Sequence, residues 1–214
     1  MTFPEFWQQF ITGLRGTTWL EYTAVFFGIA SVLFSRLENI WVYPTGIVNT
    51  TIYIYLSVLG GLFAEAGVNV YYTVMSVVGW VLWARQKDGT AVLRITRSSR
   101  REWIWALGFF GVCWLALYLI LHHFTPSTVP AADGFASAAA YTGMWLMARK
   151  KLENWLWWVV TNIASIPLYF IKGYVFTSFQ YVVFLVLAVM GYVAWRRKLH
   201  LAVRMDKVDQ RLPG

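Results

Sequence analysis

The chain contains seven long apolar stretches, and none of them carries Asp, Glu, Lys, Arg or His near its middle. A stretch of about 20 mostly apolar residues can cross the hydrocarbon core of a bilayer as a helix. We therefore expect an all-α integral membrane protein with seven transmembrane helices. The expected spans are Leu20–Ser35, Trp41–Gly60, Val68–Trp83, Trp103–Leu121, Ala131–Met147, Trp155–Ile171 and Phe176–Trp195.

Composition supports this interpretation and excludes several classes of protein. The chain is 58% hydrophobic and 13% charged, whereas a typical soluble domain is roughly 25% charged. These values exclude an ordinary water-soluble enzyme and a disordered chain. The single cysteine, Cys113, excludes an internal disulfide and a multi-cysteine metal site. Because the N-terminus lacks a basic segment followed by a cleavage site, we expect no removable signal peptide.

The positive charges indicate how the spans are oriented. Of the 18 Lys and Arg, all but Arg15 and Lys172 lie in the first, third and fifth expected connections or in the C-terminal tail. Cytoplasmic loops carry an excess of Lys and Arg, so we expect the N-terminus outside the cell and the C-terminus in the cytoplasm. The net charge of +8 then reflects topology, and we expect no nucleic-acid binding.

Two parts of the chain resemble each other, which predicts an internal repeat. The segment Gly79-Trp80-Val81-Leu82-Trp83 recurs as Gly191-Tyr192-Val193-Ala194-Trp195, and the turn at Gly60-Gly61 corresponds to the turn at Lys172-Gly173. Each of the two longer segments is followed by a basic cluster. The third expected span therefore corresponds to the seventh.

A second similarity extends the repeat to the earlier spans. Leu37-Glu38-Asn39 recurs as Leu152-Glu153-Asn154, and Asn49, ten residues after Asn39, matches Asn162, eight residues after Asn154. Spans one to three then match spans five to seven. A repeat of three spans would leave the next repeat inverted in the membrane, and the fourth span restores the original direction, so the two repeats are parallel. Parallel repeats with a binding site between them near the midplane are a known plan of transporters.

The expected architecture is a 3+1+3 arrangement of two parallel three-helix repeats joined by a linker helix, in a single transmembrane domain over residues 1–214. We expect the first repeat at 19–84, the linker helix at 103–121, the second repeat at 131–197 and a cytoplasmic tail at 198–214.

The spans contain amide, hydroxyl and indole side chains at helical spacing. Trp155, Trp158 and Asn162 are three and four residues apart, so they share one helix face. Indole rings stack on aromatic rings and attract cations, and amides recognise hydroxyls and carboxamides. This pattern favours a flat polar ring compound, uncharged or cationic, as ligand; the alternative is that the amides join packed helices. The other candidate binding residues are Asn49, Tyr43, Thr45, Tyr53, Asn69, Thr73, Ser76, Trp80 and Gln180.

The lack of charge within the spans also limits the possible chemistry. Ionisable residues inside a membrane mark proton relays and ion-coupled steps, so their absence argues against a pump or a proton-coupled transporter. A membrane enzyme would have to use Cys113 with His122 and His123, which have no acidic partner nearby in the sequence. We expect no catalytic residue, no metal ligand and no cofactor.

The segment from Glu153 to Asn162 resembles the W-x-x-W-x-x-x-N motif of the Pnu family of bacterial vitamin transporters. The segments 43–49 and 75–80 resemble the same family, and the similarity extends from about Trp19 to Lys198. The chain is most similar to the members that transport nicotinamide riboside. One departure is Val78, because the family often has Tyr before Gly-Trp at this point.

The resemblance implies transport of nicotinamide riboside, a form of vitamin B3 and a precursor of NAD. It implies facilitated diffusion with alternating access, no ion or ATP coupling, and trapping of the vitamin through phosphorylation by a cytoplasmic kinase. It also implies a homotrimer in the bacterial inner membrane. In this interpretation Trp155 and Trp158 face the ring, while Asn49 and Asn162 bind its amide or ribose hydroxyls.

Three alternatives remain open at the level of sequence. The first is a carrier of thiamine, riboflavin or another ring-containing vitamin, because relatives in the same family are assigned to these. The second is a sugar carrier with the same 3+1+3 plan. The third is a receptor or structural membrane protein that transports nothing.

Overall fold

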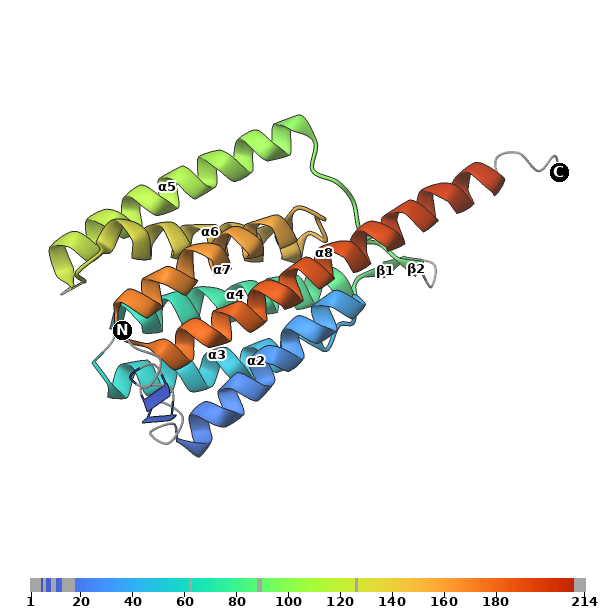
Figure 1. The fold of residues 1–214 in the computed structure, drawn as a ribbon. Helices are drawn as coiled ribbons and strands as arrows, with labels where there is room; N and C mark the ends of the chain where they lie inside the picture. The colour runs from blue at the N-terminus through green and yellow to red at the C-terminus, as the bar shows by residue number, and fades with distance from the viewer. Residues whose placement is uncertain are drawn as a thin grey trace.

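The computed structural model describes residues 5, 7–8, 11–12, 18–61, 63–87, 90–125 and 127–209. Seven long helices follow the seven expected spans (Figure 1). They are α2 (Trp19–Leu37), α3 (Val42–Leu59), α4 (Phe63–Ala84), α5 (Arg100–Phe124), α6 (Pro130–Ala148), α7 (Asn154–Ile171) and α8 (Val175–Asp209). Two short antiparallel strands, β1 (Gln86–Lys87) and β2 (Thr90–Ala91), lie in the α4–α5 connection and are not expected from the sequence.

Local sequence explains where several helices begin. Thr18 caps α2 and Ser99 caps α5, each in a reciprocal capping box with the Glu three residues later. Helices α2, α4, α5 and α8 are long and apolar enough to cross a membrane by composition alone. Helices α3, α6 and α7, which follow the other three expected spans, contain most of the buried hydroxyl and amide side chains.

The helices form two three-helix bundles. One consists of α2, α3 and α4, the other consists of α6, α7 and α8, and α5 packs against α6. Across the junction α2 packs against α8, and α4 packs against α6. The first helix of each bundle thus contacts the third helix of the other, which is the reciprocal contact of a two-fold pair. The fold is therefore the expected 3+1+3 arrangement of parallel repeats.

The backbone gives the register of the repeat. Glu38 and Lys150 both have left-handed backbone conformations at helix ends (φ 62° and 51°), and so do Gly61 and Gly173 (φ 70° and 81°). Glu38 and Lys150 are 112 residues apart, and the same offset relates the two glycines and the starts of α3 and α7. The alignments of the glycine turns and of the segments that begin at Gly79 and Gly191 are therefore confirmed.

The other sequence alignment is wrong by three residues at the Leu-Glu-Asn segments and by one residue at Asn49. Glu38 corresponds to Lys150 and not to Glu153, because both end a helix in the left-handed conformation. In the same register Asn49 corresponds to Thr161 and not to Asn162. The similarity of the two Leu-Glu-Asn segments does not reflect structural equivalence.

Most of the cations lie at one end of the bundle, which we call the basic end. It contains the α2–α3 and α6–α7 turns, the α4–α5 connection and the C-terminal part of α8. Helix α8 continues beyond its expected span and extends past the other helices (Figure 1), so the expected tail is helical as far as Asp209. Arg15 and Arg211 lie outside the described residues, as does most of the segment before residue 18.

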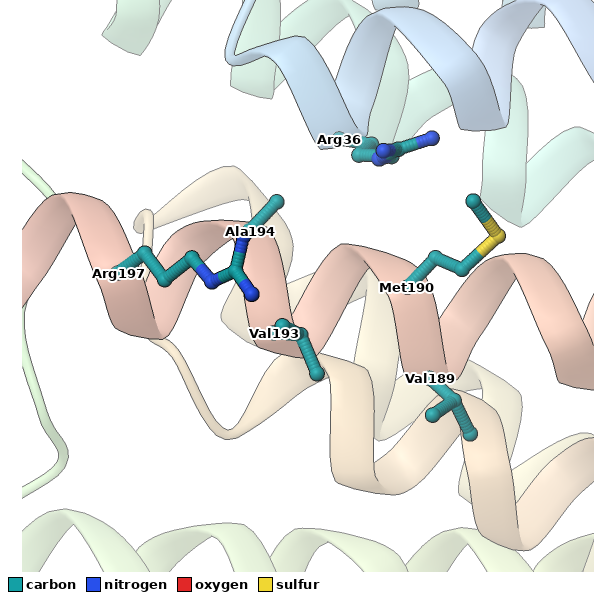
Figure 2. Close-up of a pocket in the computed structure, with 6 residues that line it drawn as sticks. All are labelled: Arg36, Val189, Met190, Val193, Ala194 and Arg197. Carbon is teal, nitrogen blue, oxygen red and sulfur yellow. The ribbon is translucent and has the colours of Figure 1, made fainter.

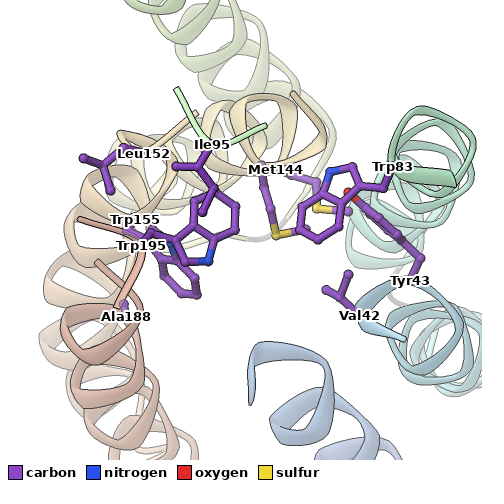
Figure 3. Packing of buried hydrophobic residues seen from close by; sticks show 10 residues of the cluster. Val42, Tyr43, Trp83, Ile95, Met144, Leu152, Trp155, Ala188 and Trp195 are labelled. Carbon is purple, nitrogen blue, oxygen red and sulfur yellow. The ribbon is translucent and has the colours of Figure 1, made fainter. Parts of the chain in front are cut away.

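Two equivalent contacts between rings and glycines hold the third helix of each repeat against the second. The Tyr43 ring lies against Gly79 and packs edge-to-face on Trp83, with 5.2 Å between ring centroids. Trp155 lies against Gly191 and packs in the same way on Trp195, at 5.7 Å. Figure 3 shows the two groups on either side of the buried cluster, with Met144 between them.

The Gly191 contact predicts a specific loss of stability. A Cβ at Gly191 would overlap the buried Trp155 ring, and overpacking of a core costs about 1–3 kcal/mol. We expect Gly191→Ala to lower the midpoint of thermal unfolding in detergent by several degrees. Gly108→Ala is the matched control, because a Cβ at Gly108 on α5 meets nothing within 4 Å. Equal midpoints for the two variants would contradict the packing role of Gly191.

Candidate functional site

One face of α7 carries the motif on which the sequence prediction depends. Trp155 and Asn162 are buried on this helix, and Trp158 is half-buried. The face continues at the same spacing with Ser165, which is buried, and Tyr169, which is half-buried. Asn162 lies midway along α7, and no hydrogen bond among the described residues involves its amide. A buried amide without a protein partner is available to a ligand.

The two tryptophans of this face differ in their surroundings. Trp155 is 2% exposed and packs between Gly191 and Trp195. Trp158 approaches Gly143 of α6 and lies 6.4 Å from Tyr72 of α4, measured between ring centroids. Trp158 therefore bridges the two repeats, whereas Trp155 is a core residue beneath it.

The equivalent face of α3 has smaller side chains. Tyr43, Gly46 and Thr50 occupy the positions that correspond to Trp155, Trp158 and Asn162 in the 112-residue register. Gly46 lies beside the hydroxyls of Ser31 and Ser76. The space that an indole fills in the second repeat is thus lined by small polar groups in the first, so the two halves present different surfaces.

Three other predicted residues of α3 have roles within the protein. Thr45 donates to the backbone carbonyl of Trp41 on its own helix, at 2.7 Å. Asn49 donates from Nδ2 to the carbonyl of Ala24 on α2, also at 2.7 Å. The Tyr53 hydroxyl interacts with Gln180 of α8, which brings two predicted residues together from different repeats.

The predicted residues of α4 separate into two sets. Asn69 and Ser76 are buried, and Thr73 is half-buried with its hydroxyl 2.7 Å from that of Thr50. Trp80 is 41% exposed and does not share their face. Gly79, one position earlier, occupies the buried face instead.

A group of tyrosines that the sequence interpretation does not single out lies beside these residues. Tyr72 contacts Tyr141 of α6 edge-to-face at 5.9 Å, and Tyr169 of α7 stacks on Tyr181 of α8 at 5.1 Å, both measured between ring centroids. Tyr181 also interacts with Ser165. One sequence signal could have identified Tyr169: it continues the Trp155, Trp158 and Asn162 stripe by another two steps at helical spacing.

A layer of charged and aromatic contacts joins the repeats at the basic end. We call Ser35, Glu38, Trp83, Lys150 and Trp195 the basic-end layer. The Lys150 ammonium is 2.9 Å from Glu38 and lies 4.5 Å from the centroid of the Trp83 ring. The Trp195 indole N–H donates to the Ser35 carbonyl at 2.9 Å. Lys198 makes a second ion pair with Glu38, at 3.2 Å.

A hollow on the surface lies away from all of the predicted binding residues. It opens between α2 and α8 at the basic end (Figure 2). Its lining residues are Arg36, Val189, Met190, Val193, Ala194 and Arg197. Within the described part of the chain, no group of three or more His, Cys, Asp or Glu side chains could hold a metal ion.

Comparisons with known proteins agree with this arrangement. The nicotinamide riboside transporter PnuC of Escherichia coli (strain K12) is 24% identical over 83% of this chain and 85% of its own length. PnuC of Neisseria mucosa is also 24% identical, over 84% of this chain and 73% of its own length. The riboflavin/roseoflavin transporter RibM of Streptomyces davaonensis is 23% identical, over 83% and 84%.

A solved structure shares the fold. The crystal structure of the vitamin B3 transporter PnuC superposes with a TM-score of 0.67 at 24% identity, covering 90% of this chain and 87% of that one. The sequence profile of the family described as nicotinamide mononucleotide transporter matches residues 18–197. Since that match covers most of the chain, the protein belongs to the nicotinamide mononucleotide transporter family of membrane transporters.

Proposed function

We propose that this protein transports nicotinamide riboside across the bacterial inner membrane. The observation that carries the proposal is the buried, unpartnered amide of Asn162 on the same face as Trp158. Nicotinamide riboside contains a cationic pyridinium ring, a carboxamide and a ribose. Asn162 is suited to the carboxamide or a ribose hydroxyl, because an amide both donates and accepts hydrogen bonds. The family consists of transporters, which argues against an enzyme.

Aromatic side chains supply the second part of the recognition. In our proposal Trp158 stacks on the pyridinium ring, and Tyr72 and Tyr181 face it from the neighbouring helices. A desolvated cation over an aromatic face is stabilised by roughly 2 kcal/mol. Trp155 supports Trp158 from beneath, because its own faces contact Gly191 and Trp195. Asn49 holds α3 against α2 rather than binding the vitamin.

The charges favour a nucleoside over a nucleotide. Phosphate groups in proteins are bound by Arg or Lys. The described cations lie towards the helix ends. Lys150, which is buried, pairs with Glu38 at 2.9 Å, and Lys172, which is half-buried, pairs with Asp133 at 2.6 Å. Without a free cation beside Asn162, the phosphate of a mononucleotide would be desolvated without compensation.

We propose facilitated diffusion with alternating access, as the family resemblance implies, and the same features support it. The residues that we assign to the site include no Asp, Glu, Lys, Arg or His, which argues against an ion-coupled step. In our proposal the basic-end layer closes the path from the site to the basic end. Its contacts between the two repeats must break before the vitamin can leave at that end. By the positive-inside rule the basic end is cytoplasmic, which puts the C-terminus in the cytoplasm and the N-terminus outside. A cytoplasmic kinase then traps the vitamin by phosphorylation.

Two further parts of the proposal rest on the family resemblance. The protein forms a homotrimer, as the resemblance implies. The alternative substrates are thiamine and riboflavin, and the similarity to a riboflavin transporter gives the latter a specific basis. Asn162 and the aromatic group would serve a flavin ring as well, so binding measurements have to separate these vitamins.

The binding proposal predicts a selective effect at Asn162. We expect Asn162→Ala to bind nicotinamide riboside at least tenfold more weakly in detergent, measured by calorimetry, because the amide loses its hydrogen bonds to the ligand. Nicotinamide mononucleotide, thiamine and riboflavin should bind the native chain at least tenfold more weakly than nicotinamide riboside.

The matched control is Thr161→Ala. Thr161 is also buried on α7 without a hydrogen-bond partner in the described residues. It is one residue before Asn162 and therefore points about 100° away from it around the helix, so its removal should change the affinity by less than threefold. An unchanged affinity in Asn162→Ala would remove Asn162 from the site. Tighter binding of riboflavin than of nicotinamide riboside would make riboflavin the substrate instead.

The transport mechanism predicts uptake without energy input. Purified protein in liposomes should equilibrate labelled nicotinamide riboside with no ion gradient and no ATP. The final internal concentration should equal the external one, and an added proton or sodium gradient should not raise it. Accumulation above the external concentration in response to either gradient would contradict facilitated diffusion.

The basic-end layer predicts a change in accessibility. Glu38→Gln removes the partner of Lys150, which is only 7% exposed, and an unpaired buried charge destabilises the closed arrangement. Ser35 is 2% exposed in this layer. In a Cys113→Ser, Ser35→Cys background, Glu38→Gln should raise the rate at which a membrane-impermeant thiol reagent labels Cys at position 35 from the basic end at least threefold.

The control for this experiment reverses the ion pair. Because Glu38 also pairs with Lys198, Glu38→Lys is combined with Lys150→Glu and Lys198→Glu, which keeps opposite charges at both contacts and should bring the labelling rate back towards that of the background variant. An unchanged rate in Glu38→Gln would show that this ion pair does not close the basic end.

A further inference from the structure

The hollow between α2 and α8 has two positive charges and an apolar wall. Arg36 faces it from α2, and Arg197 extends along α8 beside it (Figure 2). Neither guanidinium has a carboxylate within ion-pair distance among the described residues. Val189 and Val193, which line it from α8, are 48% and 41% exposed. Cationic and apolar surfaces therefore meet at the end of a transmembrane seam.

We propose that this hollow binds an anionic phospholipid, with the headgroup phosphate on Arg36 and Arg197 and an acyl chain along the apolar surface of α8. A guanidinium has a planar fork of donors that matches two phosphate oxygens. Basic pockets between transmembrane helices on the cytoplasmic side are suited to lipid headgroups of this charge. A soluble phosphate compound would leave the valine wall uncovered, which favours a lipid as the occupant.

The internal repeat contains a natural comparison. The seam between α4 and α6 is equivalent to that between α8 and α2. In the 112-residue register Arg85 corresponds to Arg197, and Val81 corresponds to Val193, but Ala148 stands where α2 has Arg36. The second seam thus has a similar apolar wall and only one of the two guanidinium groups. We therefore place the strong site at the α2–α8 seam alone.

The position of the site gives the lipid a structural consequence. One lining helix belongs to each repeat, so a bound headgroup joins the two repeats. The seam also contains the hydrogen bond from Trp195 to Ser35 and the hydrogen bond from Lys198 to the Leu37 carbonyl. The lipid therefore lies beside the contacts that close the basic end.

Native mass spectrometry of the full chain in detergent tests the proposal. The probes are phosphatidylglycerol and phosphatidylcholine with identical acyl chains, and the soluble competitor is glycerol 3-phosphate. We expect the native chain to bind phosphatidylglycerol at least tenfold more tightly than phosphatidylcholine. Arg36→Gln with Arg197→Gln should remove this preference, whereas the matched pair Arg85→Gln with Arg149→Gln should keep it.

Three outcomes would overturn the proposal. The first is an equal affinity of the native chain for the two lipids. The second is a preference for phosphatidylglycerol that survives in Arg36→Gln with Arg197→Gln. The third is displacement of phosphatidylglycerol by equimolar glycerol 3-phosphate, which would indicate a site for a soluble phosphate compound. If Arg36→Gln with Arg197→Gln fails to fold, Val193→Trp provides a second test. This substitution fills the apolar wall and keeps both charges, and it should lower the affinity for phosphatidylglycerol at least fivefold. Unchanged affinity in that variant also contradicts the site.

Discussion

Inside a bilayer every polar group has to find its partner within the protein, and this constraint organises the bundle. The hydroxyl of Thr45 bonds to its own helix, Thr50 and Thr73 bond to each other between α3 and α4, and Asn49 bonds to a carbonyl of α2. Asn162 is 4% exposed, and none of the hydrogen bonds of the described residues satisfies its amide. The Thr161 hydroxyl and the Trp155 indole N–H, on the same helix, are also buried without a partner among those residues. We therefore propose this part of α7 as the place where a polar ligand supplies the missing hydrogen bonds.

The fold was predictable because lipid imposes a simple pattern. The lack of charge in the spans indicates each helix, and the distribution of Lys and Arg indicates which ends lie together. The features that the sequence does not predict lie beyond the membrane, where that pattern stops. Helix α8 continues to Asp209 because its C-terminal part, rich in charged residues, is still a good helix former, although it is too polar to count as a span. The β1–β2 pair consists of two-residue strands, which are too short to show a period.

The site was predictable only in part, because aromatic residues are common throughout this chain. The spacing of Trp155, Trp158 and Asn162 predicts one wall of the candidate site, because it puts an amide and two indoles on one helix face. Tyr72, Tyr141 and Tyr181 come from three other helices, α4, α6 and α8, and no spacing within one segment relates them. Trp80 illustrates the limit of periodicity: it lies four residues after Ser76 and Gly79 lies three after it, so both positions fit a helical stripe. Only the contact between Gly79 and Tyr43 decides that the glycine faces inward.

The two-fold relation between the repeats explains why their sequences differ at the axis and at the candidate site. Equivalent residues that touch each other across a two-fold axis lie on that axis. Glu38 and Lys150 are such a pair, and so are Ser35 and Met147, whose Oγ and Sδ atoms are 3.4 Å apart. Two identical halves would put like charges together at the first pair, so an ion pair on the axis requires the repeats to diverge there.

The same argument applies to the candidate site. A ligand with a ring at one end and hydroxyls at the other needs unlike walls, and Trp158 with Asn162 opposite Gly46 with Thr50 provides them. The two repeats therefore diverge at the axis and at the candidate site. The similarity of the two Leu-Glu-Asn segments lies beside this divergent region and gives a register three residues from the structural one.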